Sequence, residues 1–319
     1  MDKKEQGCAF RTSIGGQALI EGILMRGPQR QAIVVRTEDG LVKKVEELHL
    51  IKDKYPILGW PLIRGTVNFL SSMVNGVRAL MFSADYFPDD EAAQPSKFDL
   101  WLEKHVSAEK LQLVLVWVAV IAAVGMSLGL FLLLPSLVAG LVSRWIENVA
   151  LINLIEGVVK VVIFLCYLIF CSKQKDIHRV FCYHGAEHKT IFCYEAGLEL
   201  TVENVRPQPL HHPRCGTSFL FVVIVVSILF SSVVFTFVDG GNALVRMLVH
   251  LLLLIPVVGV TYEFNRYVGG HDNWLTRLLS KPGLWMQNFT TNEPDDSMIE
   301  VAIEAVKLVL PDHEGDDQW

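Results

Sequence analysis

Charged residues are scarce in this sequence. Only 19% of its 319 residues are Asp, Glu, Lys or Arg, whereas 51% are hydrophobic. A soluble domain usually carries about 25% charged residues, so this composition excludes one large soluble core and favours segments buried in lipid. Basic residues are not in excess either, because the net charge is -6. Nucleic-acid-binding domains are normally basic, and we therefore expect no nucleic-acid partner.

Three familiar signals are also missing. The six cysteines are irregularly spaced and form no CxxC pair, so we expect thiols or metal ligands rather than disulfides. The N-terminus, MDKKEQGCAF, lacks the apolar core and cleavage site of a signal peptide, which leaves targeting to the first membrane span. The stretch GGQALIEGILMRG is not a GxGxxG followed by a helix, which excludes dinucleotide binding there. Its glycines indicate tight backbone bends.

Long hydrophobic runs are present. Crossing a bilayer takes roughly 20 apolar residues, and four stretches qualify: 112–134, 149–171, 218–238 and 244–264, the first ended by Pro135. Lys and Arg gather on the cytoplasmic side of a membrane. The connections between spans one and two and between spans three and four hold a single basic residue, Arg144, while the other segments hold many. This pattern predicts a multi-pass inner-membrane protein with both termini in the cytoplasm.

The whole pattern predicts an α-helical polytopic membrane protein with a small cytoplasmic α+β domain. Residues 31–50 favour a β-hairpin, because AIVVRT and LVKKVEEL flank an Asp-Gly turn. Residues 61–87 favour an amphipathic helix, lying either in the membrane interface or against the soluble domain, and residues 298–310 favour another. The expected divisions are a tail (1–11), a β-containing unit (12–58), the amphipathic helix (59–87), a linker (88–111), spans one and two (112–171), a cytoplasmic His/Cys loop (172–217), spans three and four (218–264) and a cytoplasmic C-terminal segment (265–319).

The loop between spans two and three contains YHGAEHK. If this stretch is helical, His184 and His188 share a face one turn apart and can chelate one ion. Glu187 lies beside them as a base for water, which gives the HxxEH pattern. Two histidines on a helix are also common on protein surfaces and in cores, so the motif alone leaves both interpretations open.

A second cluster, HHPRCG, comes just before the third span. His212 and Cys215 offer ligands for zinc, and Arg214 offers a cation for a phosphate group. Together with the two helical histidines they predict either a closed four-ligand structural site or an open site of three ligands and water. Glu195 and Glu263 are further candidates for oxygen ligands. Inside the second span, Glu156 and Lys160 are expected to neutralise each other or to contact the fourth span.

Four motifs in the same order resemble the YqhQ-type family of bacterial membrane proteins. They are GGQALIEGILMRG, YHGAEHKTIFCYEAG, LTVENV followed by HPRCGTSF, and PGLWMQNFTTNEPDD, and the resemblance runs from about Gly15 to Leu310. The family is catalogued as a domain of unknown function and is sometimes labelled a predicted metal-dependent enzyme, so the resemblance implies a metal site. The site residues it implies are His184, Glu187, His188, His212, Arg214 and Cys215, with Gln17, Glu21, Arg26, Gln287, Thr290 and Thr291 as further members.

Two functions of different classes fit these features. The first is a membrane-embedded metal-dependent hydrolase at the cytoplasmic surface, in which zinc activates water, Glu187 accepts a proton, and Arg214 with Arg26 binds an anionic group such as a lipid phosphate. The alternative is a non-enzymatic scaffold, assembly factor or insertion accessory with a structural His/Cys cluster, bound to a protein partner or to a second copy. A transporter is less favoured, because four spans are few and no inverted repeat is visible.

Overall fold

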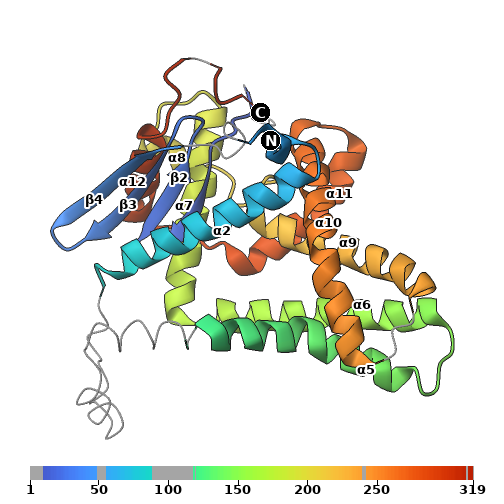
Figure 1. Cartoon of the computed structure of the whole chain (residues 1–319). Helices are drawn as coiled ribbons and strands as arrows, with labels where there is room; N and C mark the ends of the chain where they lie inside the picture. The colour runs from blue at the N-terminus through green and yellow to red at the C-terminus, as the bar shows by residue number, and fades with distance from the viewer. Residues whose placement is uncertain are drawn as a thin grey trace, which may run out of the picture. The chain divides into compact units, whose positions relative to one another are not determined.

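A computed structural model of the chain describes residues 10–48, 55–87, 118, 120–238, 242–313 and 315–318 (Figure 1). These residues form a mostly helical protein with one four-stranded sheet and four helices long and apolar enough to cross a membrane, which confirms the predicted fold class. Most of the predicted tail, the linker 88–111 and the start of the first predicted span lie outside the described residues. The elements are β1 (Gly15–Leu19), β2 (Gly22–Arg26), β3 (Arg30–Thr37), β4 (Gly40–Glu47), the short helix η1 (Pro56–Gly59), α2 (Ile63–Ala84), the π-helical turn η2 (Gly129–Leu133), α5 (Leu134–Val142), α6 (Val149–Ser172), α7 (Lys175–Glu195), α8 (Val202–Val205), α9 (Gly216–Phe237), α10 (Ala243–Gly270), α11 (Trp274–Thr290) and α12 (Asp296–Lys307).

The chain divides into two compact units. One comprises Met1–Tyr86, Cys166–Val226 and Leu254–Trp319, and the other comprises Phe87–Leu165 and Ser227–Leu253. The sheet and the His/Cys motifs belong to the first unit. The described residues of the second unit come mainly from the apolar helices.

The sheet is an antiparallel meander in the order β1-β2-β3-β4. The predicted hairpin is confirmed as β3 and β4, which pair from Thr37 with Gly40 onward. Gly40 has a φ of 126°, a backbone conformation that favours glycine. The glycine-rich stretch upstream forms a second hairpin, β1 and β2, with a tight two-residue turn between Leu19 and Gly22. The sequence predicted tight bends in this stretch but not the two strands. Gly22 lies within this hairpin, where a Cβ would come 2.5 Å from the main-chain oxygen of Val34.

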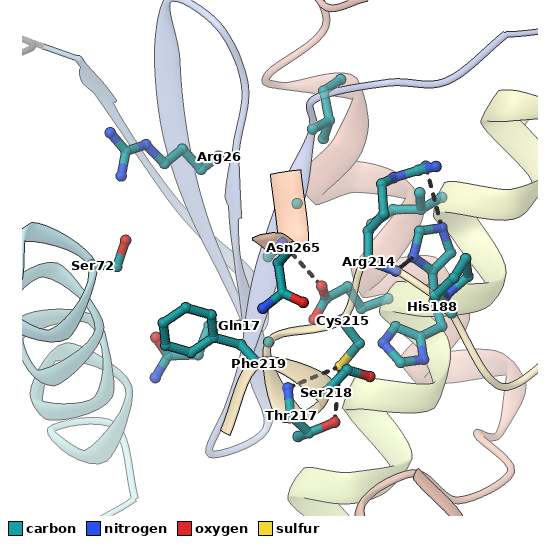
Figure 2. Close-up of a pocket in the computed structure, with 18 of the residues that line it drawn as sticks. Gln17, Arg26, Ser72, His188, Arg214, Cys215, Thr217, Ser218, Phe219 and Asn265 are labelled. Carbon is teal, nitrogen blue, oxygen red and sulfur yellow. Dashed lines mark hydrogen bonds between the residues drawn. The ribbon is translucent and has the colours of Figure 1, made fainter. Parts of the chain in front are cut away.

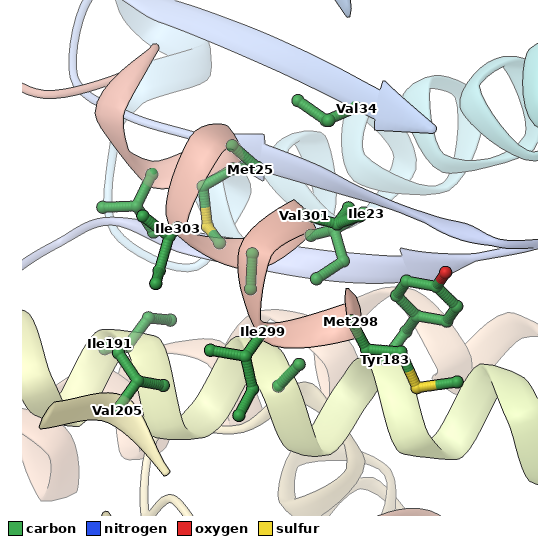
Figure 3. Close-up of a cluster of buried hydrophobic side chains, with 14 of the residues drawn as sticks. Ile23, Met25, Val34, Tyr183, Ile191, Val205, Met298, Ile299, Val301 and Ile303 are labelled. Atoms are coloured by element: carbon green, nitrogen blue, oxygen red, sulfur yellow. The ribbon is translucent and has the colours of Figure 1, made fainter. Parts of the chain in front are cut away.

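The core of the first unit lies where α12 packs between the sheet and α7 (Figure 3). Ile23 and Met25 of β2 meet Ile299 and Val306 of α12, and Tyr183 of α7 completes the cluster. The predicted amphipathic helix at 298–310 is thus confirmed as α12, capped by the Asp295 side chain. Because α7 is held in this core along much of its length, the side chains on its other face have fixed positions.

The four apolar helices agree with the predicted spans except at the first. Described residues of that helix run from Val120 to Val142, so Pro135 does not end it as the sequence predicted. Proline lacks the N–H that pairs with the carbonyl four residues earlier, and its ring crowds that carbonyl. The π-helical turn η2 comes just before Pro135, and its wider winding accommodates the ring within a continuous helix.

The second unit buries a cluster of charged side chains centred on Glu156 of α6. Arg246 of α10 donates to its carboxylate (Nε to Oε2, 3.1 Å), and His250 Nε2 lies 2.7 Å from Oε1. Lys160 lies 3.4 Å from the same carboxylate, and Ser136 of α5 donates to it at 2.9 Å. Both contacts predicted for this pair therefore occur together. Glu156 pairs with Lys160 within α6, and it also contacts Arg246 and His250 of α10, the fourth span.

Candidate metal centre

The two ligand candidates of the YHGAEHK motif, His184 and His188, and the candidate base Glu187 lie on α7. The segment predicted as a loop is helical from Lys175 to Glu195, so His184 and His188 do stand one turn apart, with ring centroids 4.3 Å from each other. Glu187 and His188 are buried, and His184 is half-buried. The helix thus supplies two imidazoles and one carboxylate to the same small region.

Cys215 joins these histidines from the turn that precedes α9. Its Sγ lies 3.1 Å from His184 Nε2, and one ligand atom from each of His184, His188 and Cys215 falls within 4.8 Å of the others. Thr217 holds the sulfur from the first turn of α9 (main-chain N to Sγ, 3.4 Å). Two imidazoles and one thiolate are a donor set that zinc prefers.

Both imidazoles are oriented by main-chain carbonyls. His184 Nδ1 donates to the carbonyl oxygen of Thr290, and His188 Nδ1 donates to that of Leu210, each at 2.7 Å. A carbonyl accepts only, so Nδ1 carries the proton and, in the neutral ring, Nε2 keeps its lone pair. Histidines that bind metals are normally fixed in this way by a partner on the other nitrogen.

Two buried atoms beside this group have no hydrogen-bond partner among the described residues: His188 Nε2 and Glu187 Oε2. Leaving such an atom unsatisfied costs about 1–3 kcal/mol, so native proteins rarely keep one without a reason. A bound cation would give the His188 nitrogen a partner. The residues present therefore fit a metal ion.

Electrostatics favour the ligand form of the cysteine. Burial alone would raise the pKa of the Cys215 thiol, but the charges of His184 and His188 outweigh it and hold that pKa well below its usual value. Burial likewise opposes protonation of His184, yet the adjacent Cys215 sulfur raises the pKa of His184 to about 9. Both shifts favour a thiolate beside an imidazolium, and a metal ion would replace the imidazolium proton.

Glu187 stands next to the group as a potential base. Its Oε1 accepts a hydrogen bond from the main-chain N of Gly16 at 2.9 Å, while Oε2 has no partner. Burial raises the pKa of this carboxyl, which makes it a better proton acceptor and donor near neutral pH.

His212 and Arg214 of the HHPRCG motif form a separate cluster with Glu195. His212 is buried, its Nδ1 accepts from the main-chain N of Arg214, and its Nε2 lies 3.6 Å from Glu195. Arg214 pairs with Glu195. Burial lowers the pKa of His212 to about 4, so its ring is neutral. With both nitrogens engaged, His212 lies outside the three-ligand group, and Arg214 is committed to a carboxylate of the protein.

Gln287 and the remaining predicted site residues do not belong to the three-ligand group. Gln287 of α11 accepts from the main-chain N of His212 and donates to its carbonyl, each at 2.8 Å. Glu21 pairs with Arg179, outside the cavity. Glu263 binds Arg64 of α2 (Oε1 to Nε, 2.7 Å). Gln17 and Arg26 line the cavity described next.

A cavity of about 1060 Å³ opens in front of the ligand group (Figure 2). His184, Glu187, His188 and Cys215 form part of its wall. Figure 2 shows Arg26 on the side of the sheet and His188 on the side of α7. Strands β1 and β2 and helices α2, α9, α10 and α11 supply most of the remaining lining. The volume leaves room for a large substrate beside the ligand group.

Gly185 allows the chain after α11 to approach α7. Asn292 N donates to the Phe181 carbonyl at 2.9 Å, and a Cβ on Gly185 would collide with the Asn292 carbonyl and come 2.8 Å from Leu210. We expect Gly185→Ala to lower the free energy of unfolding by about 1–3 kcal/mol, as overpacking does. Thermal unfolding in detergent measures this, with Gly140→Ala of α5 as control, because nothing lies within 4 Å of a Cβ there. Equal melting temperatures for the two variants would contradict the close approach.

Comparisons with known proteins match the chain to a family of unknown function. Residues 60–312 match the family model described as "Protein of unknown function (DUF1385)". The chain is 33% identical over 309 residues to "Uncharacterized protein YqhQ" of Bacillus subtilis (strain 168), covering 93% of this chain and 92% of that protein. No solved structure matches.

Proposed function

Because the chain belongs to the DUF1385 family, whose function is unknown, we propose its function from the site itself: a membrane-embedded, metal-dependent hydrolase that works at the cytoplasmic face of the bacterial inner membrane. The observation that carries the proposal is the group of His184, His188 and Cys215, with their ligand atoms within 4.8 Å of one another. The four apolar helices and the basic segments on one side of them support the location and the cytoplasmic termini.

An open site is favoured over a closed one. A structural zinc site takes four protein ligands, whereas a catalytic site takes three and keeps a position open. His212, the fourth candidate, is engaged by Arg214 and Glu195, and the remaining three residues line a large cavity. This arrangement supports an enzyme over a scaffold with a structural His/Cys cluster.

The residues around the group have separable roles in hydrolysis. When bound, a zinc ion supplies Lewis-acid activation of water or of the bond to be cleaved. Glu187 accepts a proton at Oε2 and can return it to the leaving group, which its raised pKa favours. The carbonyls of Thr290 and Leu210 keep both imidazoles in the binding orientation.

The metal content of purified protein tests this proposal. We expect about one zinc ion per wild-type chain by mass spectrometry, as for a three-ligand site, and a fall to background in His188→Ala and Cys215→Ser. His178→Ala is the matched control, because His178 is exposed on the same helix and lies outside the ligand group. We expect Glu187→Gln to keep its zinc. Wild-type protein without stoichiometric metal would rule out the proposal.

A further inference from the structure

Helix α2 packs against one of the membrane-spanning helices. Thr66 donates to the carbonyl of Ile255 in α10 at 3.1 Å, and Asn68 donates to the Tyr262 hydroxyl at 2.9 Å. Gly259 of α10 lies so close to the start of α2 that a Cβ would come 2.5 Å from the Leu62 oxygen. Residues 255–262 belong to the apolar stretch of α10, so this part of α2 lies at the depth of the membrane.

The two faces of α2 differ in polarity. Between Ile63 and Ala84 the helix has no Asp or Glu. One face presents exposed apolar side chains to the surroundings, namely Leu70, Met73, Val74, Val77, Leu80 and Met81. Asn68, Ser72 and Asn75 of another face line the cavity. The helix therefore forms a wall whose apolar face is exposed and whose polar face borders the cavity.

Arg26 is a cation that lines this cavity, as are Arg214 and Arg266. Arg26 lies at the end of β2, and among the described residues no Asp or Glu forms an ion pair with it. Arg214, which the sequence suggested as a second cation for an anionic group, is paired with Glu195. A half-buried guanidinium without a carboxylate is a bidentate donor for phosphate.

We infer that the cavity binds a membrane lipid with a phosphate-bearing anionic headgroup, which Arg26 anchors, while the chains leave between α2 and the spanning helices. Phe69 of α2 stacks on Phe219 of α9 with ring centroids 5.6 Å apart, and both residues line the cavity. They offer the apolar contact that the first part of an acyl chain needs. Such a lipid would be the substrate of the proposed hydrolase, and its cleavage rests on that proposed function. Its binding does not, because binding involves Arg26 and not the metal ligands.

The test is lipid binding by full-length protein in detergent, followed by native mass spectrometry. The probes are dioctanoyl phosphatidylglycerol, dioctanoyl phosphatidylcholine and glycerol phosphate. We expect one phosphatidylglycerol to bind per chain, and Arg26→Gln to weaken it by about tenfold, as the loss of a charge-assisted pair does. Arg78→Gln is the matched control, because Arg78 is exposed on α2 and does not line the cavity.

Two further variants keep the test decisive if Arg26→Gln folds poorly. Arg26→Lys keeps the charge and should retain part of the affinity, and Ser72→Phe should block the cavity without removing a charge. Equal binding of phosphatidylcholine, or of glycerol phosphate, would overturn the inference, and so would equal losses in Arg26→Gln and Arg78→Gln. Repeating the titration after chelation separates this inference from the metal proposal, because the lipid should still bind when the metal is absent.

Discussion

Glu156→Ala is expected to destabilise the protein by about 3–5 kcal/mol, the cost of breaking a buried ion pair by removing one partner. Its carboxylate is 2% exposed and neutralises Arg246 and Lys160 within the second unit. Without it, two cations face each other among apolar helices, where charges are costly. The amount of protein that accumulates in membranes and its melting temperature in detergent measure the effect.

Two controls separate the loss of this ion pair from a general loss of charge. Glu147→Ala removes an exposed carboxylate just before α6, and we expect a change within about 0.5 kcal/mol, as for most surface substitutions. Lys160→Met should be milder than Glu156→Ala, because Glu156 keeps Arg246 and His250 as partners. If Glu156→Ala and Glu147→Ala have the same melting temperature, the buried charged cluster does not hold the helices together.

In metal-free protein, Cys215 is expected to react with iodoacetamide near pH 6, where ordinary thiols are protonated. The thiolate is the reactive form, and the pKa of Cys215 is held well below its usual value, whereas an unperturbed cysteine has a pKa of about 8.5. Reactivity should therefore persist as the pH falls below 8 and disappear only as it passes through the lowered pKa. Peptide mass spectrometry of the alkylated protein reports each cysteine separately.

The other cysteines and two variants provide the comparison. Burial raises the pKa of Cys182 and Cys193, so these thiols should stay unmodified at pH 6. His184→Ala removes a charge that stabilises the thiolate and should shift the reactivity of Cys215 to higher pH, whereas His178→Ala should not. Added zinc should protect Cys215. A Cys215 that reacts only above pH 8 in metal-free wild type would contradict the ion pair.

Local patterns in the sequence predict much of the fold. Hydrophobic length identified the spanning helices, and the Asp-Gly turn identified the β3–β4 hairpin. The prediction failed at Pro135, because a π-helical turn just before it absorbs the ring. It also missed the two strands of the β1–β2 hairpin, because Gly16 and Gly22 lie in these strands, where a Cβ would meet a main-chain oxygen of the neighbouring strand.

The site was harder to predict, because its geometry depends on contacts distant in sequence. The sequence grouped His212 with the ligands, but Gln287 fixes its backbone and Glu195 engages its ring. The groups that orient His184 and His188 are main-chain carbonyls, and every residue type has one, so no sequence signal marks them. The pairing of Glu263 with Arg64 spans 199 positions, which no local pattern reveals.

X-ray absorption at the zinc edge of purified wild-type protein tests the metal centre most directly. The His184, His188 and Cys215 group predicts one sulfur ligand at about 2.3 Å and two nitrogen ligands at about 2.0–2.1 Å, with a light oxygen or nitrogen atom in the remaining position. Cys215→Ser should remove the sulfur shell. A spectrum with only oxygen neighbours, or with a sulfur shell that survives in Cys215→Ser, would contradict this centre.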